Sequence, residues 1–332
     1  MPRRQVIFVI LLLAVIGVIA LFFSLFDVRK AEAPKRVFIL TASDLQLNSV
    51  EGIKAGLKEL GYREGGDIIL ELFNPKGDME LTKNLAVQMV ASRPDLIVSV
   101  STSASRAVKD ANQDAKLPVV FVDVGNFEEL GIQNIQRPGG FMSGVVVDNV
   151  PAAPKRMEIL KTLLPGLKTI ALLVNNKHVS YDEILKTHEE GAKKLGLKLL
   201  WYPVTKKEEV SPAMERLAKD HPDAFMTTSE AVISGNAALI APVLRQAKIP
   251  SIDFNVERGV SSGYLMVYGI ARFDVGKQGA RIIDKVLKGE SPGNIPVEFA
   301  SQITFEVSEI LAKETGLKIP DAILLQANKI YR

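Results

Sequence analysis

The sequence of 332 residues contains no cysteine, and this single absence excludes several kinds of site. Without thiols the chain can form no disulfide, no thiolate zinc site and no cysteine nucleophile, and it cannot carry a lipid on an N-terminal cysteine. Histidine is almost as scarce: His178, His188 and His221 share no spacing typical of a metal site. We therefore predict that the protein has neither a metal centre nor a bound cofactor.

Most enzyme motifs are also missing. The chain has no GxxxxGKS/T phosphate loop, no GxGxxG dinucleotide fingerprint and no HExxH zinc motif. Gly259 to Gly263 do match the G-x-S-x-G pattern of serine hydrolases, but they precede an expected strand at 264–268 instead of joining a strand to a helix. No histidine follows Ser261 to complete a triad. The sequence therefore predicts a protein that is not an enzyme.

Most of the chain has no excess of basic or acidic side chains. The protein has 41 basic and 38 acidic side chains, a net charge of +3. The first 30 residues hold four of the basic residues and one of the acidic ones, so that residues 31–332 are neutral as a whole. Because no basic excess is left to neutralise a phosphate backbone, we do not expect nucleic acid as a partner.

A long uncharged segment stands at the N-terminus. Residues 6–26 are interrupted only by Gly17 and Ser24, and as a helix they would span roughly 30 Å, about the thickness of the bilayer core. Ala31-Glu32-Ala33 fits a signal-peptidase pattern, but Pro34 follows it and the apolar run is longer than in cleavable signals. We therefore expect residues 1–35 to be a retained transmembrane anchor or an uncleaved signal. Lys and Arg flank the run on both sides, and counted alone they would leave the large domain cytoplasmic.

After residue 36, short apolar runs alternate with amphipathic stretches. Strands are expected at 37–40, 68–73 and 96–100, with helices at 49–60 and 79–92 between them. The same alternation continues with strands at 119–122, 170–174, 197–202, 264–269 and 302–305 and helices at 157–164, 181–195, 273–288 and 307–315. This order is typical of an α/β protein with parallel sheets that helices cover on both faces.

Three short segments recur in the same order at nearly constant spacing. Lys54 to Gly61 resembles Glu189 to Gly196, Pro94-Asp95 recurs as Pro222-Asp223, and Lys116-Leu117-Pro118 recurs as Lys248-Ile249-Pro250. The offsets are 135, 128 and 132 residues. We interpret this as a duplication that gives two similar lobes of about 130 residues each.

Polar residues follow the expected strands, at the edge where open parallel sheets bind their ligands. Hydroxyl groups and a helix start at Ser101–Ser105 favour an anion such as a carboxylate, and Asp123 and Asp253 offer the opposite charge for an amine. Helix capping and Asx turns explain each of these residues, taken singly, equally well. The candidate ligand-binding residues are Ser43, Asp44, Thr102, Ser103, Ser105, Asp123, Asn126, Asn176, Thr228, Glu230, Asp253 and Asn255.

Several segments resemble one known family over roughly residues 36–320. They are Gly56–Tyr62, Pro94–Val98 with Ser101-Thr102, Lys116–Phe121, Gly144-Val145, Leu163–Pro165, Lys194–Leu197, Lys248–Pro250 and Val286–Glu290. In these segments the chain resembles substrate-binding proteins of ABC transporters with the type I periplasmic-binding-protein fold, and most closely the subgroup of tryptophan- and tyrosine-type binding proteins.

The resemblance implies two Rossmann-like lobes joined by a three-segment hinge, with crossings near 145–149, 268–274 and 300–306. Lobe 1 would comprise residues 36–146 with 271–301, and lobe 2 residues 147–270 with 302–332. The domain would be extracytoplasmic, despite the flanking charges of the anchor. Closure of the lobes would bury a small polar or aromatic organic solute, such as an amino acid, and present it to a permease and its ATPase. The protein would act as a monomer; the alternative is a ligand-sensing subunit of a signalling or chemoreceptor system.

The resemblance also implies roles for individual residues. Thr102, Ser103 and Ser105 would hold a ligand carboxylate, Asp253 would hold the amine, and the second lobe would contribute Thr228, Glu230 and Asn255. The family often has Pro where this chain has Ser103, and Asp or Asn in the loop where it has Ser229 and Glu230. The ligand therefore need not be the one that the relatives bind.

Overall fold

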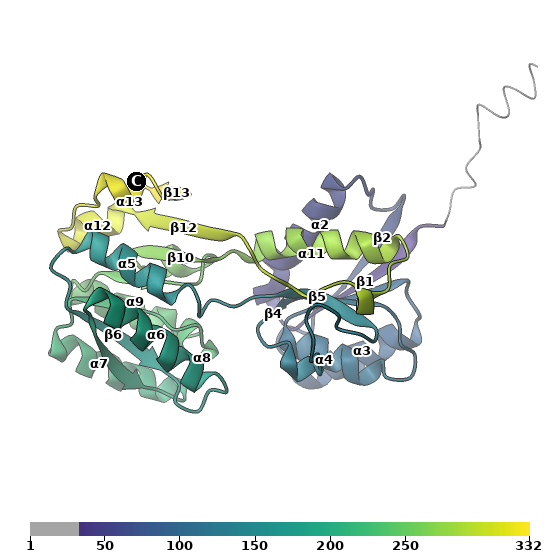
Figure 1. Cartoon of the computed structure of the whole chain (residues 1–332), viewed down its shortest axis with the longest axis horizontal. Coiled ribbons are helices and arrows are strands. Elements are labelled where there is room, and N and C mark those ends of the chain that lie inside the picture. Colours follow the sequence, from purple (N-terminus) through teal and green to yellow (C-terminus); the bar gives the residue numbers. More distant parts are fainter. Residues whose placement is uncertain (1–32) are drawn as a thin grey trace, which may run out of the picture.

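The computed structural model describes residues 33–332. The expected membrane anchor at 6–26 lies outside this range. Within the range, no helix is both long and apolar enough to cross a bilayer. The described chain forms two α/β lobes that lie side by side along the long axis of the molecule, as Figure 1 shows.

The first lobe contains a six-stranded sheet in the order β11-β5-β4-β3-β1-β2, in which all neighbours are parallel. Its strands are β1 (Lys35–Thr41), β2 (Ile68–Phe73), β3 (Leu96–Val100), β4 (Val119–Val124), β5 (Met142–Val146) and β11 (Glu298–Phe299). Its helices are α2 (Leu47–Glu59), α3 (Met79–Ala91), α4 (Thr102–Ala111) and α11 (Arg272–Leu287), with 3-10 turns at Asp44–Gln46, Glu128–Leu130 and Pro292–Asn294.

The second lobe contains a seven-stranded sheet in the order β13-β12-β10-β9-β8-β6-β7. Its strands are β6 (Thr169–Val174), β7 (Lys198–Pro203), β8 (Ala224–Met226), β9 (Ser251–Asp253), β10 (Met266–Ile270), β12 (Ile303–Ser308) and β13 (Lys329–Tyr331). Its helices are α5 (Ala153–Leu163), α6 (Tyr181–Leu195), α7 (Val210–Asp220), α8 (Ala231–Ser234), α9 (Ala237–Gln246), α10 (Gly259–Ser262), α12 (Glu309–Thr315) and α13 (Asp321–Leu324), with a 3-10 turn at Lys207–Glu209.

Two strands depart from the expected parallel arrangement. β12 runs antiparallel to β10, and β13 runs parallel to β12, so both are opposite in direction to the other five strands of the second sheet. The reason is the path of β12, which follows β11 of the first lobe after a short crossing, with no helix between them. It therefore enters the second sheet from the interlobe side, where the parallel strands end.

The two lobes have equivalent strand orders, 2-1-3-4-5 and 7-6-8-9-10. The repeated Pro-Asp pairs occupy equivalent places, because Asp95 precedes β3 and Asp223 precedes β8. Each aspartate accepts a backbone N–H at the start of the neighbouring strand, from Arg36 of β1 and from Thr169 of β6, both at 2.8 Å. The repeated Pro-Asp pair in the sequence therefore corresponds to the same hydrogen bond between adjacent strands in both lobes.

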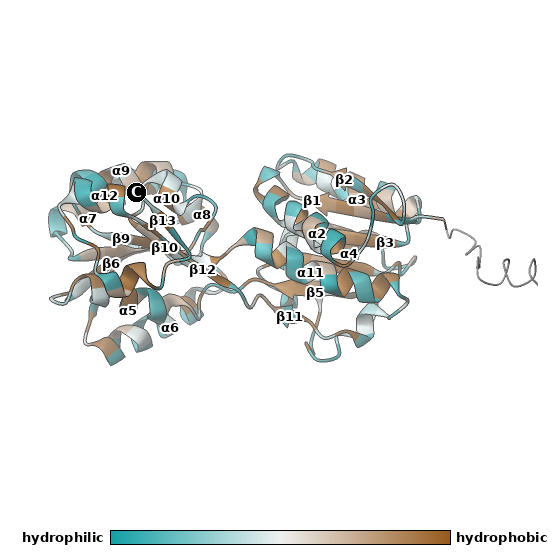
Figure 2. Ribbon diagram, turned by 90° about the horizontal axis from the view of Figure 1, so that it is seen from above, coloured by the Kyte–Doolittle hydropathy of each residue, from teal (hydrophilic) through white to brown (hydrophobic). Residues whose placement is uncertain are grey.

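Buried apolar side chains fill the space between each sheet and its helices. The strands are accordingly made mostly of hydrophobic residues, which are brown in Figure 2. In the first lobe, α2 and α11 approach closely because both carry glycine at their contact. A Cβ on Gly52 would lie 1.9 Å from the carbonyl oxygen of Phe273, and one on Gly276 would lie 2.0 Å from that of Ser49. The start of α11 is thus held directly against the helix that follows β1.

The chain passes between the lobes three times, from β5 to α5, from β10 to α11 and from β11 to β12. Arg156 of α5 is fully buried at the first two passages, and its guanidinium donates to the carbonyls of Asn149 at 3.1 Å and Tyr268 at 3.3 Å. The Asn149 side chain in turn accepts the N–H of Ile270 at 3.3 Å. These bonds tie the first crossing segment to the second.

Candidate functional site

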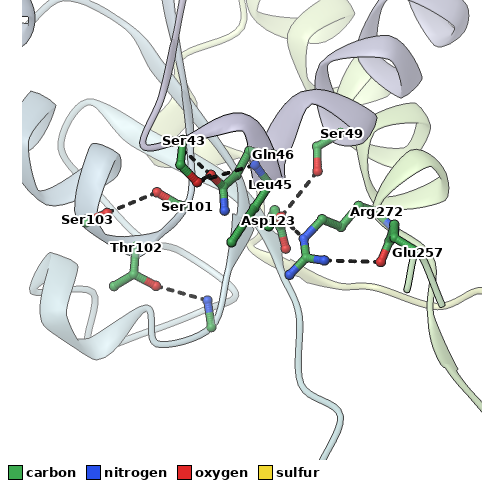
Figure 3. Close-up of polar contacts among 11 residues, drawn as sticks. Ser43, Leu45, Gln46, Ser49, Ser101, Thr102, Ser103, Asp123, Glu257 and Arg272 are labelled. Carbon is green, nitrogen blue, oxygen red and sulfur yellow. Dashed lines mark hydrogen bonds and ion pairs between the residues drawn. The ribbon is translucent and has the colours of Figure 1, made fainter. Parts of the chain in front are cut away.

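The strand order of the first sheet reverses between β1 and β3, and the loops that follow these two strands lie together (Figure 3). Ser101 links β3 to α4 with a φ of 107° and a ψ of 160°, a region that residues with a side chain rarely adopt. Its hydroxyl and carbonyl oxygens accept the N–H groups of Ala104 and Ser105. The N–H groups of Thr102 and Ser103 are left at the open end of α4, where an anion is favoured.

Hydroxyl side chains surround this helix start. The Ser103 hydroxyl lies 3.3 Å from that of Ser101, and the Thr102 hydroxyl accepts the N–H of Gly125 at 3.1 Å, which joins α4 to the loop after β4. The Ser105 side chain is fully buried beneath the loop, and its hydroxyl donates to the carbonyl of Ser101 at 2.7 Å. Ser105 therefore supports the loop from within the lobe.

The loop after β1 supplies the facing side of this region. Ser43 caps a 3-10 turn in a reciprocal arrangement with Gln46, whose side-chain oxygen accepts the backbone N–H of Ser43 at 3.1 Å. Asp44 accepts the amide of Asn74 at 2.7 Å and so joins the loops that follow β1 and β2. Sequence reasoning missed Gln46, although its spacing of three residues from Ser43 is the signature of a capping box.

An ion-pair chain lies beside these loops (Figure 3). Asp123 is the next-to-last residue of β4 and has a φ of 57°. Its carboxylate accepts the Arg272 Nε at 2.9 Å and the Ser49 hydroxyl at 3.3 Å. Arg272 also donates from Nη1 to Glu257 of the second lobe at 3.1 Å. Burial raises the pKa of Asp123 above its usual value, against the opposing effect of Arg272. Two carboxylates share one guanidinium, so the chain of three residues carries a net negative charge when both are ionised.

Sequence reasoning missed Arg272 and Glu257. Arg272 comes two residues after β10, and Glu257 lies four residues after β9. Extending the search for strand-end residues by a few positions would have reached both.

In the second lobe, the polar side chains after β8 form hydrogen bonds within the lobe. Glu230 is buried, and its carboxylate accepts the Asn175 N–H at 2.7 Å and the Thr228 hydroxyl. The Thr228 hydroxyl also contacts the carbonyl of Leu173 at 2.9 Å. Burial raises the pKa of Glu230. These two candidate residues bond to each other and to β6.

Asp253, the predicted amine anchor, is also buried inside the second lobe. Its Oδ1 accepts the Thr227 hydroxyl at 2.5 Å and the Phe254 N–H at 2.9 Å. It thereby shapes the loop that leads to Glu257. The side-chain oxygen of the neighbouring Asn255 is buried without a hydrogen-bond partner among residues 33–332.

The remaining candidates lie at the edges of these loops. Asn126 accepts the Glu128 N–H at 2.9 Å, which forms an Asx turn, and Asn176 is exposed after β6. The G-x-S-x-G match forms α10, where the Ser261 hydroxyl donates to the carbonyl of Arg258 at 2.9 Å. In the described part of the chain, no three acidic or histidine side chains cluster in a way that could hold a metal ion.

Burial of Asp253 makes a testable contribution to stability. Its pKa is raised to about 6 from 3.8, so between these values the folded protein binds a proton that the unfolded chain has released. Its ionisation therefore costs stability as pH rises from about 4 to 6, on the order of 3 kcal/mol when complete. We expect Asp253→Asn to gain about 1–3 kcal/mol over the wild type between pH 4.5 and pH 7.5 in urea unfolding. Parallel pH profiles of the two proteins would contradict this.

Comparisons with known proteins agree with this architecture. The family model described as "ABC transporter substrate binding protein" matches residues 37–331. A tyrosine-binding protein of Clostridioides difficile (strain R20291) is 28% identical over 307 residues, which are 91% of this chain and 86% of that protein.

Two solved structures share the fold over 90% of this chain. One is an ABC domain in complex with L-Trp from Streptococcus pneumoniae (24% identity, TM-score 0.76, all of that chain covered). The other is the ligand-free, open form of a substrate-binding protein with adhesive properties from Clostridium difficile (23% identity, TM-score 0.75, 99% covered). The binding domain is typically extracytoplasmic in this family. With a family match over nearly its whole described length, the chain belongs to the ABC transporter substrate-binding proteins, which bind solutes and are not enzymes.

Proposed function

We propose that the protein captures a zwitterionic amino acid with an aromatic side chain between its lobes and delivers it to a permease and ATPase. One observation carries this proposal: a place that favours an anion and a place that favours a cation lie at the same edge of the first sheet. The open end of α4 favours an anion, and the acidic chain around Asp123 favours a cation (Figure 3).

The α4 end would take the carboxylate of the solute. The N–H groups of Thr102 and Ser103 and the positive end of the helix dipole point toward the same side. The Ser101 backbone holds a strained conformation there, and such strain is concentrated at ligand sites. A carboxylate at this place would gain charge-assisted hydrogen bonds.

Asp123 fits the amine better than Asp253 does. Its carboxylate is nearly buried near the end of β4, and both Arg272 and Ser49 bond to its Oδ2, so that its Oδ1 accepts no hydrogen bond from residues 33–332. The Oδ1 of Asp253, by contrast, accepts two bonds inside the second lobe. One guanidinium neutralises only one of the two carboxylates of Asp123 and Glu257. An ammonium group would balance the other.

The second lobe would close over the solute with the loops after β6, β8 and β9. The unpaired side-chain oxygen of Asn255 supports this, because a buried acceptor without a partner is costly unless another state satisfies it. The aromatic preference is supported by the relatives, one named for tyrosine and one solved with L-Trp. The Leu45 side chain, 44% exposed beside Ser43, offers an apolar surface for a ring.

Thermal unfolding of the purified protein with a panel of solutes tests this proposal, since a ligand that binds only the folded form raises Tm. We expect L-tryptophan, L-tyrosine or L-phenylalanine to raise Tm. N-acetyl-L-tryptophan, which lacks the amine charge, and tryptamine, which lacks the carboxylate, should not. A shift with a sugar and none with any amino acid would overturn the proposal.

The lobes would move as the bodies expected from the sequence, residues 36–146 with 271–301 and residues 147–270 with 302–332. The third crossing is fixed to the first lobe by Gln278, whose side chain contacts the Phe299 carbonyl at 3.0 Å and the Ser301 N–H at 3.2 Å. Gln278 fixes the third crossing on the side of the first lobe, and Arg156 fixes the first two crossings on the side of the second lobe. We therefore expect the backbone to bend in the short parts of the crossing segments that lie between these two sets of hydrogen bonds.

We also propose that residues 6–26 tether the protein to the membrane, with the lobes outside the cytoplasm and no second copy needed for function. The support is the bilayer length of the uncharged run. Alkaline extraction of membranes should leave the full chain in the pellet. Release of the full chain into the supernatant would argue against a tether.

A further inference from the structure

Arg272 stands where the second crossing segment enters the first lobe. It is the first residue of α11, two positions after the end of β10. Its backbone N–H donates to Glu257 Oε1 at 2.6 Å, and its side chain donates to Glu257 Oε2 at 3.1 Å and to Asp123 Oδ2 at 2.9 Å. Glu257 thus serves as a cap for α11, although it belongs to the second lobe.

Among residues 33–332, the pair of Arg272 and Glu257 is the one ion pair that joins the two lobes. The three other pairs on α11 within this range, Lys277 with Glu59, Arg281 with Glu298 and Asp284 with Lys288, stay within the first lobe. Each of them has at least one side chain that is 60% exposed or more, whereas Arg272, Asp123 and Glu257 are 25%, 8% and 14% exposed. Exposed pairs contribute little, whereas partly buried charges that lose a partner are left uncompensated.

The ion-pair chain of Asp123, Arg272 and Glu257 connects both halves of the proposed site. Asp123 lies beside the α4 loop of the first lobe, and Glu257 lies in the loop that follows β9 in the second lobe. A planar guanidinium with fixed donor directions can hold two carboxylates at a defined angle, which a flexible ammonium does not do as well.

We propose that Arg272 is a positioning residue that sets the orientation of the lobes and, through Asp123, the affinity for the amino group of the solute. The role at the amine rests on the proposed function, but the role in orienting the lobes does not. When Arg272 or Glu257 is neutralised, the interlobe pair is lost and the lobes sample a wider range of angles. A smaller fraction of the molecules then holds the lobes in the orientation that binds the solute, and the apparent affinity for the solute falls in proportion.

The natural absence of cysteine allows a direct measurement on the full chain. Asn84→Cys on α3 and Glu215→Cys on α7 place spin labels on exposed positions of the two lobes. Pulsed EPR then gives the distribution of interlobe distances without any solute. We expect Arg272→Gln and Glu257→Gln to broaden this distribution. Arg281→Gln is the matched control, since it removes an ion pair from the same helix within one lobe, and it should leave the distribution unchanged.

L-tryptophan serves as the probe of affinity. We expect the two variants to raise its Kd about tenfold, and Arg272→Lys to recover part of the loss. Should Arg272→Gln fail to fold, Glu257→Gln removes the same pair from the other side and decides the question. Distance distributions of folded Arg272→Gln and Glu257→Gln that match the control would overturn the proposal. Because this measurement needs no solute, its result is separate from a failure to bind amino acids.

Discussion

Replacing Asp123 with asparagine is expected to weaken the binding of L-tryptophan or L-tyrosine by about 30-fold or more. The carboxylate is nearly buried and bonded to Arg272 and Ser49, so an ammonium at its free oxygen would form a charge-assisted bond with little competition from water. Losing one partner of such a pair typically costs about 2–5 kcal/mol. Isothermal titration of the purified variant measures the change, and the fold can be checked by its Tm.

Asp253→Asn is the matched control for this prediction. Both substitutions remove one carboxylate near the C-terminal end of a strand. The two strands, β4 in the first lobe and β9 in the second, hold equivalent places in their sheets. We expect Asp253→Asn to change the affinity far less than Asp123→Asn. The reverse order would place the amine on the second lobe, as the sequence resemblance implied, and would contradict our assignment.

The largest loss of stability is expected for Gly52→Ala. The new Cβ would lie 1.9 Å from the carbonyl oxygen of Phe273, and that atom belongs to backbone that cannot move without displacing α11. Overpacking of this kind typically costs 1–3 kcal/mol and occasionally more, and here we expect about 3 kcal/mol. Because Phe273 follows Arg272, the shift would also disturb the ion-pair chain.

Gly166→Ala provides the comparison. No atom lies within 4 Å of a Cβ built at Gly166, and its backbone conformation is open to any residue. We expect its free energy of unfolding in urea to stay within about 0.5 kcal/mol of the wild type. Equal stabilities of the two variants would show that α2 and α11 can separate at little cost, against the close contact described above.

Much of the fold could be predicted because the signals are local. Strand and helix alternation, the repeated Pro-Asp pairs and the family resemblance together gave two α/β lobes, which the structure and the family match confirm. The resemblance also gave the function, since the chain is a solute-binding component of an ABC transporter. The prediction that it is not an enzyme is confirmed by the same family.

Other features could not be predicted because they depend on contacts distant in sequence. The direction of β12 follows from its path between lobes, which periodicity does not encode. Asp253 and Glu230 follow strand ends as site residues do, but packing buries them inside the second lobe. Arg272 pairs with residues 149 and 15 positions away, so its place two residues after β10 could mark it as a candidate but could not show its partners.

We propose that the lobes close on an amino acid and release it unchanged. The labelled pair at positions 84 and 215 tests this directly, since α3 and α7 both lie at the lower edge of their lobes in Figure 1. We predict that saturating L-tryptophan or L-tyrosine shortens and narrows the interlobe distance, and that the solute recovered afterwards is chemically intact. Saturable binding with an unchanged distance distribution, or recovery of an altered solute, would contradict it.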